Sequence, residues 1–240
     1  MNQVTDPKTG KVWQLKGLKN IKDVYADVYA RWVFNCVVPE AKLKELIGID
    51  YLEPQLVRGK GVLSLCAIFM RHAAPSWMPL NLGPGLQSCA LRIACIDKRD
   101  GSPAVWVGTR YTDSFLAPVL AFLGFPSVNN DLRVTEDDEK LDFETKDKTL
   151  ECRFEKVKEK TQSVLFEKDT DFDDYFCAGV RSYSPSNDRT DIIDLHKLKD
   201  NKFQKKNMQG FLNTEFGCWP IESAYLTENG LYKWTCEGRY

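Results

Sequence analysis

The sequence has no long hydrophobic run and almost no net charge. Its longest apolar stretches, residues 61–70 and 115–125, fall well short of the roughly 20 residues that cross a bilayer as a helix. The 33 basic residues nearly balance the 34 acidic ones, giving a formal net charge of -1, so no bulk positive field attracts a phosphate backbone. We therefore expect neither a membrane nor a nucleic acid as a partner.

The first residues of the sequence also lack the apolar core of a secretory signal. We therefore expect a cytoplasmic protein, in which thiols stay reduced. None of the 8 cysteines forms a C-x-x-C pair, and there are only 2 histidines. Because zinc sites depend on closely spaced ligand pairs, we predict mostly buried thiols, no metal and no other cofactor.

Motifs that mark several enzyme classes are missing. The sequence contains no G-x-S-x-G, no P-loop and no G-x-G-x-x-G, so no motif supports a hydrolase, an NTPase or a dinucleotide-binding enzyme. The run DTDFD at residues 169–173 resembles the start of a calcium loop, but Asp174 stands where the loop needs glycine and Val180 where it needs glutamate. We interpret this run as a solvated acidic turn.

Strand-forming residues are abundant. Hydrophobic residues make up 43% and aromatic residues 12% of the 240 residues, enough for a packed core. Short runs of strand formers recur along the chain, at residues 32–38, 61–70, 88–97, 104–108, 150–157, 164–166, 176–183, 191–195, 221–226 and 230–236. This spacing predicts a mainly β fold, an antiparallel barrel with a few short helices, formed by one domain over residues 1–240.

Turn signals predict two hairpins. The run KRDG at residues 98–101 separates two predicted strands, and ENG at residues 228–230 separates the last two. Residues 72–84 are rich in proline and glycine and predict a long ordered loop, a kind that often lines a binding site. The charged residues 136–148 predict an exposed surface segment.

Three short helices are predicted. Pro39 before and Gly48 after residues 40–47 mark the first. Residues 115–123 are apolar nearly all round, so this second helix should pack across the sheet or close one barrel end. The third lies within residues 18–32, where apolar and charged residues alternate at mixed spacing.

Residues 91–128 carry the most specific pattern. A hairpin ending in AVWVG at residues 104–108, then YTD at 111–113, an apolar helix and LGFP at 123–126, resembles the acetoacetate decarboxylase superfamily. Residues 38–54 resemble the segment after that family's first strand. The resemblance covers about half of the chain and implies a barrel around an apolar pocket, and an oligomer.

In that family a pocket lysine, its pKa lowered by desolvation and an adjacent cation, forms a Schiff base with a ketone. The lysine pair follows the Gly-Phe-Pro element, where this chain has Ser127 and Val128. Residues 119–121 replace the family's Gly-Arg-Glu, and its strand glutamate falls near Cys89. The resemblance therefore implies the fold without Schiff-base decarboxylation, because neither serine nor valine forms an iminium.

Seven residues are candidates for the pocket. Arg92 lies on an apolar predicted strand and could pair with a ligand carboxylate, or its guanidinium could reach out from the barrel rim. Ser127 could donate one hydrogen bond to a ligand, or only end a helix. Arg110 and Tyr111 could line the pocket, or form an ion pair and a helix cap with Asp113.

The other three candidates are His72, Glu53 and Trp106. His72 opens the proline-rich loop and could act as a general base near the pocket mouth, although a lone histidine is more often structural. Glu53 could serve as an acid partner. Trp106 could line an apolar pocket with neighbouring aromatic residues, or pack in the core.

The sequence therefore predicts a protein that binds a small, partly apolar organic carboxylate or carbonyl compound in a barrel pocket. Two alternatives stay open. One is a lyase, aldolase-like enzyme or isomerase of the same fold that uses different pocket residues, such as His72, Glu53 or Arg92. The other is a non-enzymatic interaction module, which a solidly packed barrel interior would indicate.

Overall fold

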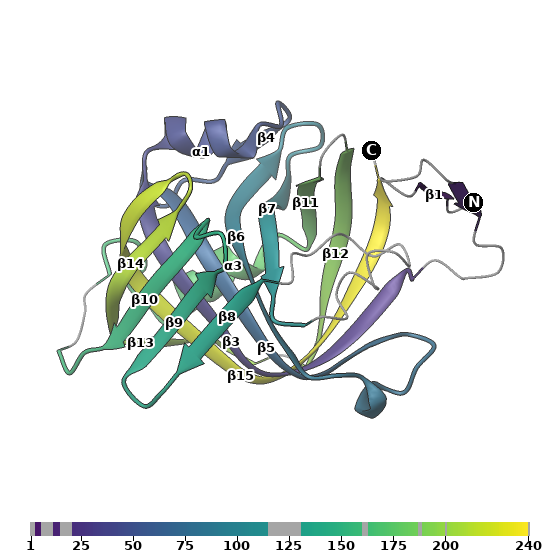
Figure 1. Cartoon of the computed structure of the whole chain (residues 1–240). Coiled ribbons are helices and arrows are strands. Elements are labelled where there is room, and N and C mark those ends of the chain that lie inside the picture. The colour runs from purple at the N-terminus through teal and green to yellow at the C-terminus, as the bar shows by residue number, and fades with distance from the viewer. Residues whose placement is uncertain are drawn as a thin grey trace.

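The computed structural model describes residues 3–5, 12–14, 21–114, 131–159, 163–186, 189–199 and 201–239. Strands dominate these ranges (Figure 1). Strands β1 (Gln3–Thr5) and β2 (Val12–Gln14) pair with each other, and the other described strands form one 13-stranded sheet.

The elements of this sheet follow the chain from one end to the other. Its strands are β3 (Asp23–Val38), β4 (Leu52–Pro54), β5 (Gly61–Pro75), β6 (Leu86–Asp97), β7 (Ser102–Thr112), β8 (Leu132–Glu136), β9 (Lys140–Thr145), β10 (Leu150–Lys156), β11 (Arg181–Ser186), β12 (Arg189–Lys199), β13 (Gln204–Lys206), β14 (Met208–Thr214) and β15 (Gly217–Arg239). The helical elements are α1 (Glu40–Ile47), the 3₁₀ turn η1 (Leu80–Leu82) and α3 (Asp169–Cys177).

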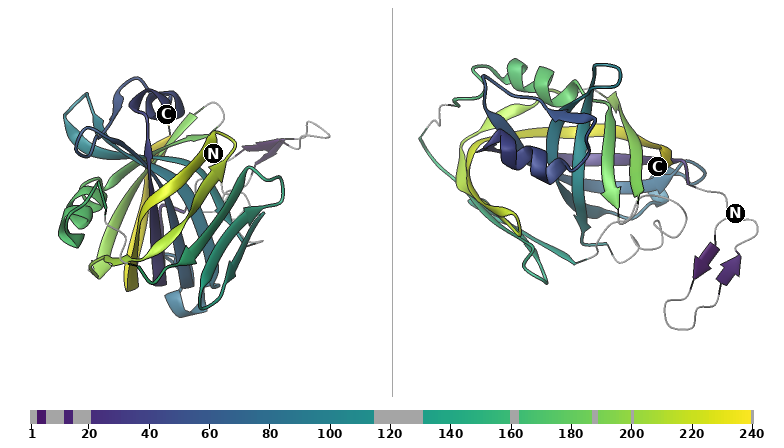
Figure 2. Two further views of the ribbon diagram at one scale, coloured as in Figure 1. Left: turned by 90° about the vertical axis from the view of Figure 1, so that its left-hand side faces the viewer. Right: turned by 90° about the horizontal axis from the view of Figure 1, so that it is seen from above.

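Seven strands of the sheet close on themselves. The order β12-β11-β7-β6-β5-β3-β15 returns to β12 through a β12–β15 pairing, which makes a closed ring (Figure 2). Within the ring, β7 and β11 run parallel and the other neighbours antiparallel. From β15 the sheet also continues through β14, β10, β9 and β8, a branch that we call the second layer. The predicted mainly β fold is confirmed.

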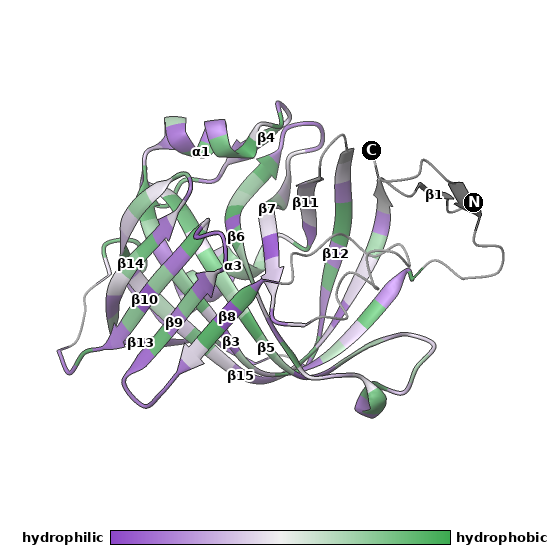
Figure 3. Cartoon of the chain, viewed as in Figure 1, coloured by the Kyte–Doolittle hydropathy of each residue, from purple (hydrophilic) through white to green (hydrophobic). Residues whose placement is uncertain are grey.

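The second layer and the ring enclose one apolar core. Phe34 on β3 stacks on Phe154 of β10 with ring centroids 3.8 Å apart, and Phe143 of β9 meets Phe34 edge-on at 6.2 Å. Hydrophobic and hydrophilic residues alternate along β8, β9 and β10, as in strands that bury one face (Figure 3).

Helix α3 packs on the opposite face of the ring strands. Phe172 of α3 stacks on Tyr225 of β15, with centroids 3.8 Å apart and the rings nearly parallel at 6°. Phe176, one turn further on, is also buried. This face lines the ring interior, so α3 covers part of that interior.

Several predicted elements are confirmed. Helix α1 occupies residues 40–47, and Gly48 ends it in the left-handed conformation with φ 59°, as a C-terminal glycine should. The hairpin at residues 98–101 joins β6 to β7, with Gly101 at φ 74°. All eight cysteines are free, and five of them are buried.

The prediction of a hairpin at residues 228–230 is wrong. Asn229 adopts φ 56°, yet β15 runs through it without reversing. Both halves of β15 pair with β3, Leu226 opposite Trp32 and Leu231 opposite Asp27. An Asn-Gly pair supplies the left-handed backbone of a tight turn, and the same conformation also fits a bulge within one continuous strand.

The predicted helix within residues 18–32 is also wrong in the part that the structure describes, because β3 begins at Asp23. Its apolar residues Val24, Ala26 and Val28 recur at every second position, the period of a strand. The segment 136–148 is not simply an exposed surface run. It contains β9, whose Leu141 and Phe143 are buried between charged neighbours.

Three further predictions fail around α3. Residues 164–166 form no strand, residues 169–173 begin a helix rather than a turn, and the strand expected from residue 176 starts only at Arg181. Three aromatic side chains at helical spacing, Phe172, Tyr175 and Phe176, are buried along one side of α3 and hold it as a helix.

The loop predicted at residues 72–84 begins later than expected, because β5 extends to Pro75 and carries His72. The predicted helix at residues 115–123 lies outside the described residues. In the part of the chain that the structure covers, no helix is long and apolar enough to span a bilayer.

Candidate functional site

A cavity of about 190 Å³ lies inside the ring, and each of the seven ring strands contributes to its wall. Most of the wall is aliphatic or aromatic, including Ile68, Val107, Ile193 and Trp234. An apolar cavity of about 150 Å³ holds benzene, so this one suits a ligand of roughly six to ten non-hydrogen atoms. Three arginines, Arg31, Arg92 and Arg110, also line it.

A β-bulge directs Arg110 into the cavity. Arg92 pairs with Val107 and Ala90 with Arg110, so two residues of β7 face Leu91 alone. The extra residue shifts the alternation of β7, and Val107 before the bulge and Arg110 after it both line the cavity.

A second bulge directs Arg31 inward. In β3, Val28 and Ala30 pair with adjacent residues of β5, so one residue of β3 has no counterpart there. Before this bulge the even-numbered Val24 lines the cavity, whereas after it the even-numbered Trp32 joins the core under the second layer and the odd-numbered Arg31 lines the cavity.

Arg92 lies between the cavity and α3. Its side chain is buried, Nη2 donates a hydrogen bond of 2.6 Å to the carbonyl oxygen of Phe176, and its guanidinium carbon lies 3.7 Å from the centre of the Phe176 ring. Phe176 belongs to the last turn of α3, whose carbonyl groups carry a partial negative charge. Burial, together with the positive charge of Arg31, lowers the pKa of Arg92 to about 10.

Arg31 lies against the same aromatic ring. Only 3% of this residue is exposed, and its guanidinium carbon lies 4.9 Å from the centre of the Phe176 ring. Its Nε donates to the sulfur of Cys66 at 3.4 Å. Within the described residues, neither Arg31 nor Arg92 forms an ion pair with a carboxylate.

Arg110 has a different environment. Its Nη2 donates a hydrogen bond of 2.6 Å to the hydroxyl of Ser184. Burial lowers the pKa of Arg110 to about 10, and the nearby carboxylate of Asp191 opposes this shift. Arg110 therefore has an anionic neighbour, unlike the other two arginines.

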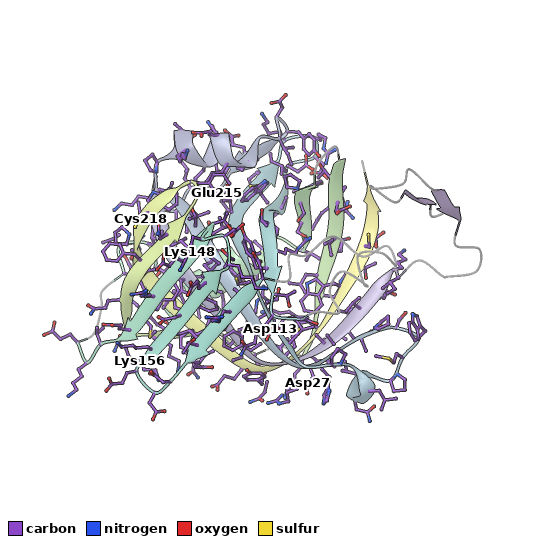
Figure 4. The ribbon with its side chains drawn as sticks, in the orientation of Figure 1. Asp27, Asp113, Lys148, Lys156, Glu215 and Cys218 are labelled. Atoms are coloured by element: carbon purple, nitrogen blue, oxygen red, sulfur yellow. The ribbon has the colours of Figure 1, made fainter. Side chains whose placement is uncertain are left out.

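Trp106 and Tyr111 project from the opposite face of β7 into a separate cleft of about 530 Å³. The hydroxyls of Tyr111 and Thr149 lie 3.1 Å apart, and burial raises the pKa of Tyr111. The indole nitrogen of Trp106 is buried without a hydrogen-bond partner. The only charged residue lining this cleft is Glu215, in the turn between β14 and β15 (Figure 4).

The structure thus divides the residues selected from the sequence. Arg92 and Arg110 share the ring cavity, whereas Trp106 and Tyr111 share the other cleft. Ser127 lies outside the described residues. That any of these residues binds a ligand stays a prediction.

His72 and Glu53 do not line the ring cavity. The Nδ1 of His72 lies 2.9 Å from the carbonyl oxygen of Gly83 and ties β5 to the loop after it. Glu53 is an exposed residue of β4, with its carboxylate 3.9 Å from Nζ of Lys44. Neither is placed to act on a molecule in the cavity.

Arg31 and Cys66 are cavity residues that the sequence reasoning missed. Arg31 precedes the run WVF at residues 32–34, and a charge beside such an apolar run is the same signal that singled out Arg92. The bulge in β3 hid its direction, because strict alternation from Val24 places residue 31 on the other face.

These features define a β-barrel protein with a small apolar cavity and buried guanidinium groups. No family model and no curated protein matches the sequence. Solved structures do match, so the comparison concerns the fold.

Acetoacetate decarboxylase matches with a TM-score of 0.58 and 11% identity, over 90% of this chain and 88% of that chain. The enzyme of Legionella pneumophila gives 0.58 and 8%, over 95% and 92%. An acetoacetate decarboxylase-like enzyme from Sphingomonas wittichii RW1 gives 0.58 and 10%, over 98% and 97%. MppR, an enduracididine biosynthesis enzyme in complex with pyruvate, gives 0.54 and 10%, over 93% and 91%. The chain has the acetoacetate decarboxylase-like fold, as the sequence resemblance predicted.

Proposed function

We propose that the ring cavity binds a small organic carboxylate, or a carbonyl compound that carries one, with Arg92 and Arg31 holding the charged end. The observation that carries this proposal is the pair of buried guanidinium groups without a carboxylate partner among the described residues. A buried charge without a counter-ion is strongly unfavourable. An anionic ligand supplies that counter-ion, and the apolar wall accommodates the rest of the molecule.

Two further observations support this proposal. The fold neighbour MppR has been solved with pyruvate, which is a small carboxylate with a carbonyl group. The ring interior also contains a cavity, whereas an interaction module that kept the barrel only as a scaffold would pack its interior solidly.

We further propose that binding involves no Schiff base. None of the described residues that line the cavity is a lysine. Borohydride treatment with acetoacetate or pyruvate, followed by intact-mass measurement, should leave the mass unchanged. A lysine adduct under conditions that trap a lysine-bearing relative would contradict this part of the proposal.

Calorimetry with pyruvate, acetoacetate and 2-oxobutyrate tests the binding proposal, with the methyl ester of pyruvate as an uncharged control. We expect the carboxylates to bind and the ester not to bind. Arg92→Met should weaken carboxylate binding by at least about tenfold, because it removes a buried, charge-assisted donor.

The matched control is Arg153→Met. Arg153 lies on β10 outside the cavity, and its side chain is 75% exposed. This variant should bind as the unsubstituted protein does. If no carboxylate binds, or if both arginine variants bind equally well, the proposal is overturned.

A further inference from the structure

The charges around the ring cavity do not balance. Three guanidinium groups line it, and the carboxylate noted beside them is that of Asp191, close to Arg110. Arg31 and Arg92 contact neutral groups: a thiol, a main-chain carbonyl and aromatic rings. Residues 115–130, the longest range outside the described residues, contain no acidic residue in their sequence.

The two unbalanced cations converge on one place. Both guanidinium carbons lie within 5 Å of the centre of the Phe176 ring, at 3.7 Å for Arg92 and 4.9 Å for Arg31. The proximity is unfavourable, since the charge of Arg31 helps to lower the pKa of Arg92. A ligand between them would therefore meet two positive charges at one end of the cavity.

The neutral contacts leave most of the donors unused. A guanidinium has five N–H groups in a planar fork. The contact with Cys66 uses Nε of Arg31 and leaves its two terminal nitrogens. The contact with Phe176 uses one terminal nitrogen of Arg92 and leaves Nε and the other. Each arginine thus keeps several donors, and such donors match the oxygens of a carboxylate or a phosphate.

From this convergence we infer that the ligand is a compact dianion, with its two negative charges close together at the end of the molecule beside Arg31 and Arg92. This inference rests on the proposed function and narrows its ligand class. A monocarboxylate neutralises one guanidinium and leaves the other buried with its charge uncompensated, whereas a dianion neutralises both. A short dicarboxylate and a small phosphate monoester share this chemistry, and both fit a cavity of about 190 Å³.

Size-matched probes at pH 8 test the inference. Succinate is compared with monomethyl succinate, which has one charge fewer, and 2-phosphoglycolate is compared with glycolate. We expect at least one dianion to bind at least about tenfold more tightly than its monoanionic partner, since only the dianion pairs both cations. The stronger binder of succinate and 2-phosphoglycolate identifies the source of the dianionic group.

Arg31→Met assigns the second charge to its cation. This variant keeps Arg92, so it should still bind monomethyl succinate but lose the preference for the dianion. Arg31→Lys keeps a positive charge and should retain part of that preference, while Arg153→Met should leave it unchanged. Melting temperatures of the ligand-free variants verify that each one is folded.

The outcomes separate the two proposals. If no carboxylate or phosphate binds, the proposed function itself fails. If monomethyl succinate binds as tightly as succinate and glycolate as tightly as 2-phosphoglycolate, the proposed function stands and the dianion inference is overturned. A preference for the dianion that persists in folded Arg31→Met also overturns it.

Discussion

Nη2 of Arg92 donates a hydrogen bond of 2.6 Å to the carbonyl oxygen of Phe176, and the same guanidinium stacks over the Phe176 ring. This contact joins β6, a strand of the ring, to the last turn of α3. It also makes the cation part of the cavity wall, because Arg92 lines the cavity from its position next to α3. Helix α3 thus holds the cavity cation through its main chain as well as through an aromatic side chain.

Arg31 should reduce the stability of the ligand-free protein. Its buried guanidinium has a thiol and aromatic rings as neighbours instead of a carboxylate. Replacing a buried charged group by a well-packed apolar one is often neutral or stabilising by about 1–4 kcal/mol. We therefore expect Arg31→Met to keep or raise the free energy of unfolding, as measured by urea denaturation without ligand.

The control for this prediction is again Arg153→Met, an exposed change expected to stay within about 0.5 kcal/mol. A fall of the unfolding free energy by more than about 1 kcal/mol in Arg31→Met would indicate that Arg31 has a structural role. Ligand-binding residues commonly lower the stability of the free protein.

Asp97 and Arg99 form a second prediction, at the β6–β7 hairpin. The carboxylate of Asp97 is buried and accepts hydrogen bonds from Nε of Arg99 at 2.9 Å and from the hydroxyl of Tyr183 at 2.7 Å. Asp97→Asn removes the charge from this cluster and should lower the free energy of unfolding by about 1–3 kcal/mol at pH 7.

The same cluster predicts a pH dependence. Hydrogen bonds from Arg99, more than any other cause, hold the pKa of Asp97 well below its ordinary value. A carboxyl with a depressed folded-state pKa contributes stability that is present above its unfolded pKa, near about 4, and is lost as the pH falls through the folded value. The stability difference between the unsubstituted protein and Asp97→Asn should therefore shrink below pH 4 in urea titrations. A difference that stays constant down to pH 2 would contradict this assignment.

The fold could be predicted from the sequence because its signals are local. The pattern of short strands, the KRDG turn and the helix between Pro39 and Gly48 depend on a few neighbouring residues, and all appear as expected. The AVWVG and LGFP elements named the fold before any geometry was known. Arg92 was recognisable as a cavity candidate because a charge on an apolar strand is unusual.

The rest of the site depended on relations between distant strands. The bulge in β3 lies next to Asn229 of β15, where neither Tyr29 nor Asn229 has a partner in the β3–β15 register. That irregularity decides which face Arg31 takes, and no pattern within β3 alone reveals it. Helix α3 was missed because its acidic first turn masks the helical spacing of its aromatic residues.

Asn229 itself supports a prediction about the long strand. Its backbone is left-handed, with φ 56°, and its side-chain oxygen accepts a hydrogen bond of 2.6 Å from Nη2 of Arg71. A β-branched residue is strained in this conformation, so Asn229→Val should cost about 1–3 kcal/mol of unfolding free energy. Asn229→Gly keeps the conformation accessible and should cost less, although both variants lose the hydrogen bond. Equal losses in urea denaturation would refute backbone strain as the cause.

Filling the cavity separates its volume from its charge. Val107 lines the cavity on β7 next to the bulge, and Val107→Trp adds an indole there without changing any arginine. We expect carboxylate binding to fall by more than about tenfold, because the ligand and the indole compete for the same space. The melting temperature should stay level or rise, since filling a void adds apolar contacts.

The matched control for the cavity variant is Val37→Trp, at an outward-facing position of β3 where the valine is 37% exposed. Calorimetry on both variants compares a tryptophan inside the ring with one outside it. Normal carboxylate affinity in Val107→Trp would show that the ligand occupies another site. The cleft beside Trp106 and Tyr111 would then be the next candidate, because it has its own volume of about 530 Å³ and faces away from the ring interior.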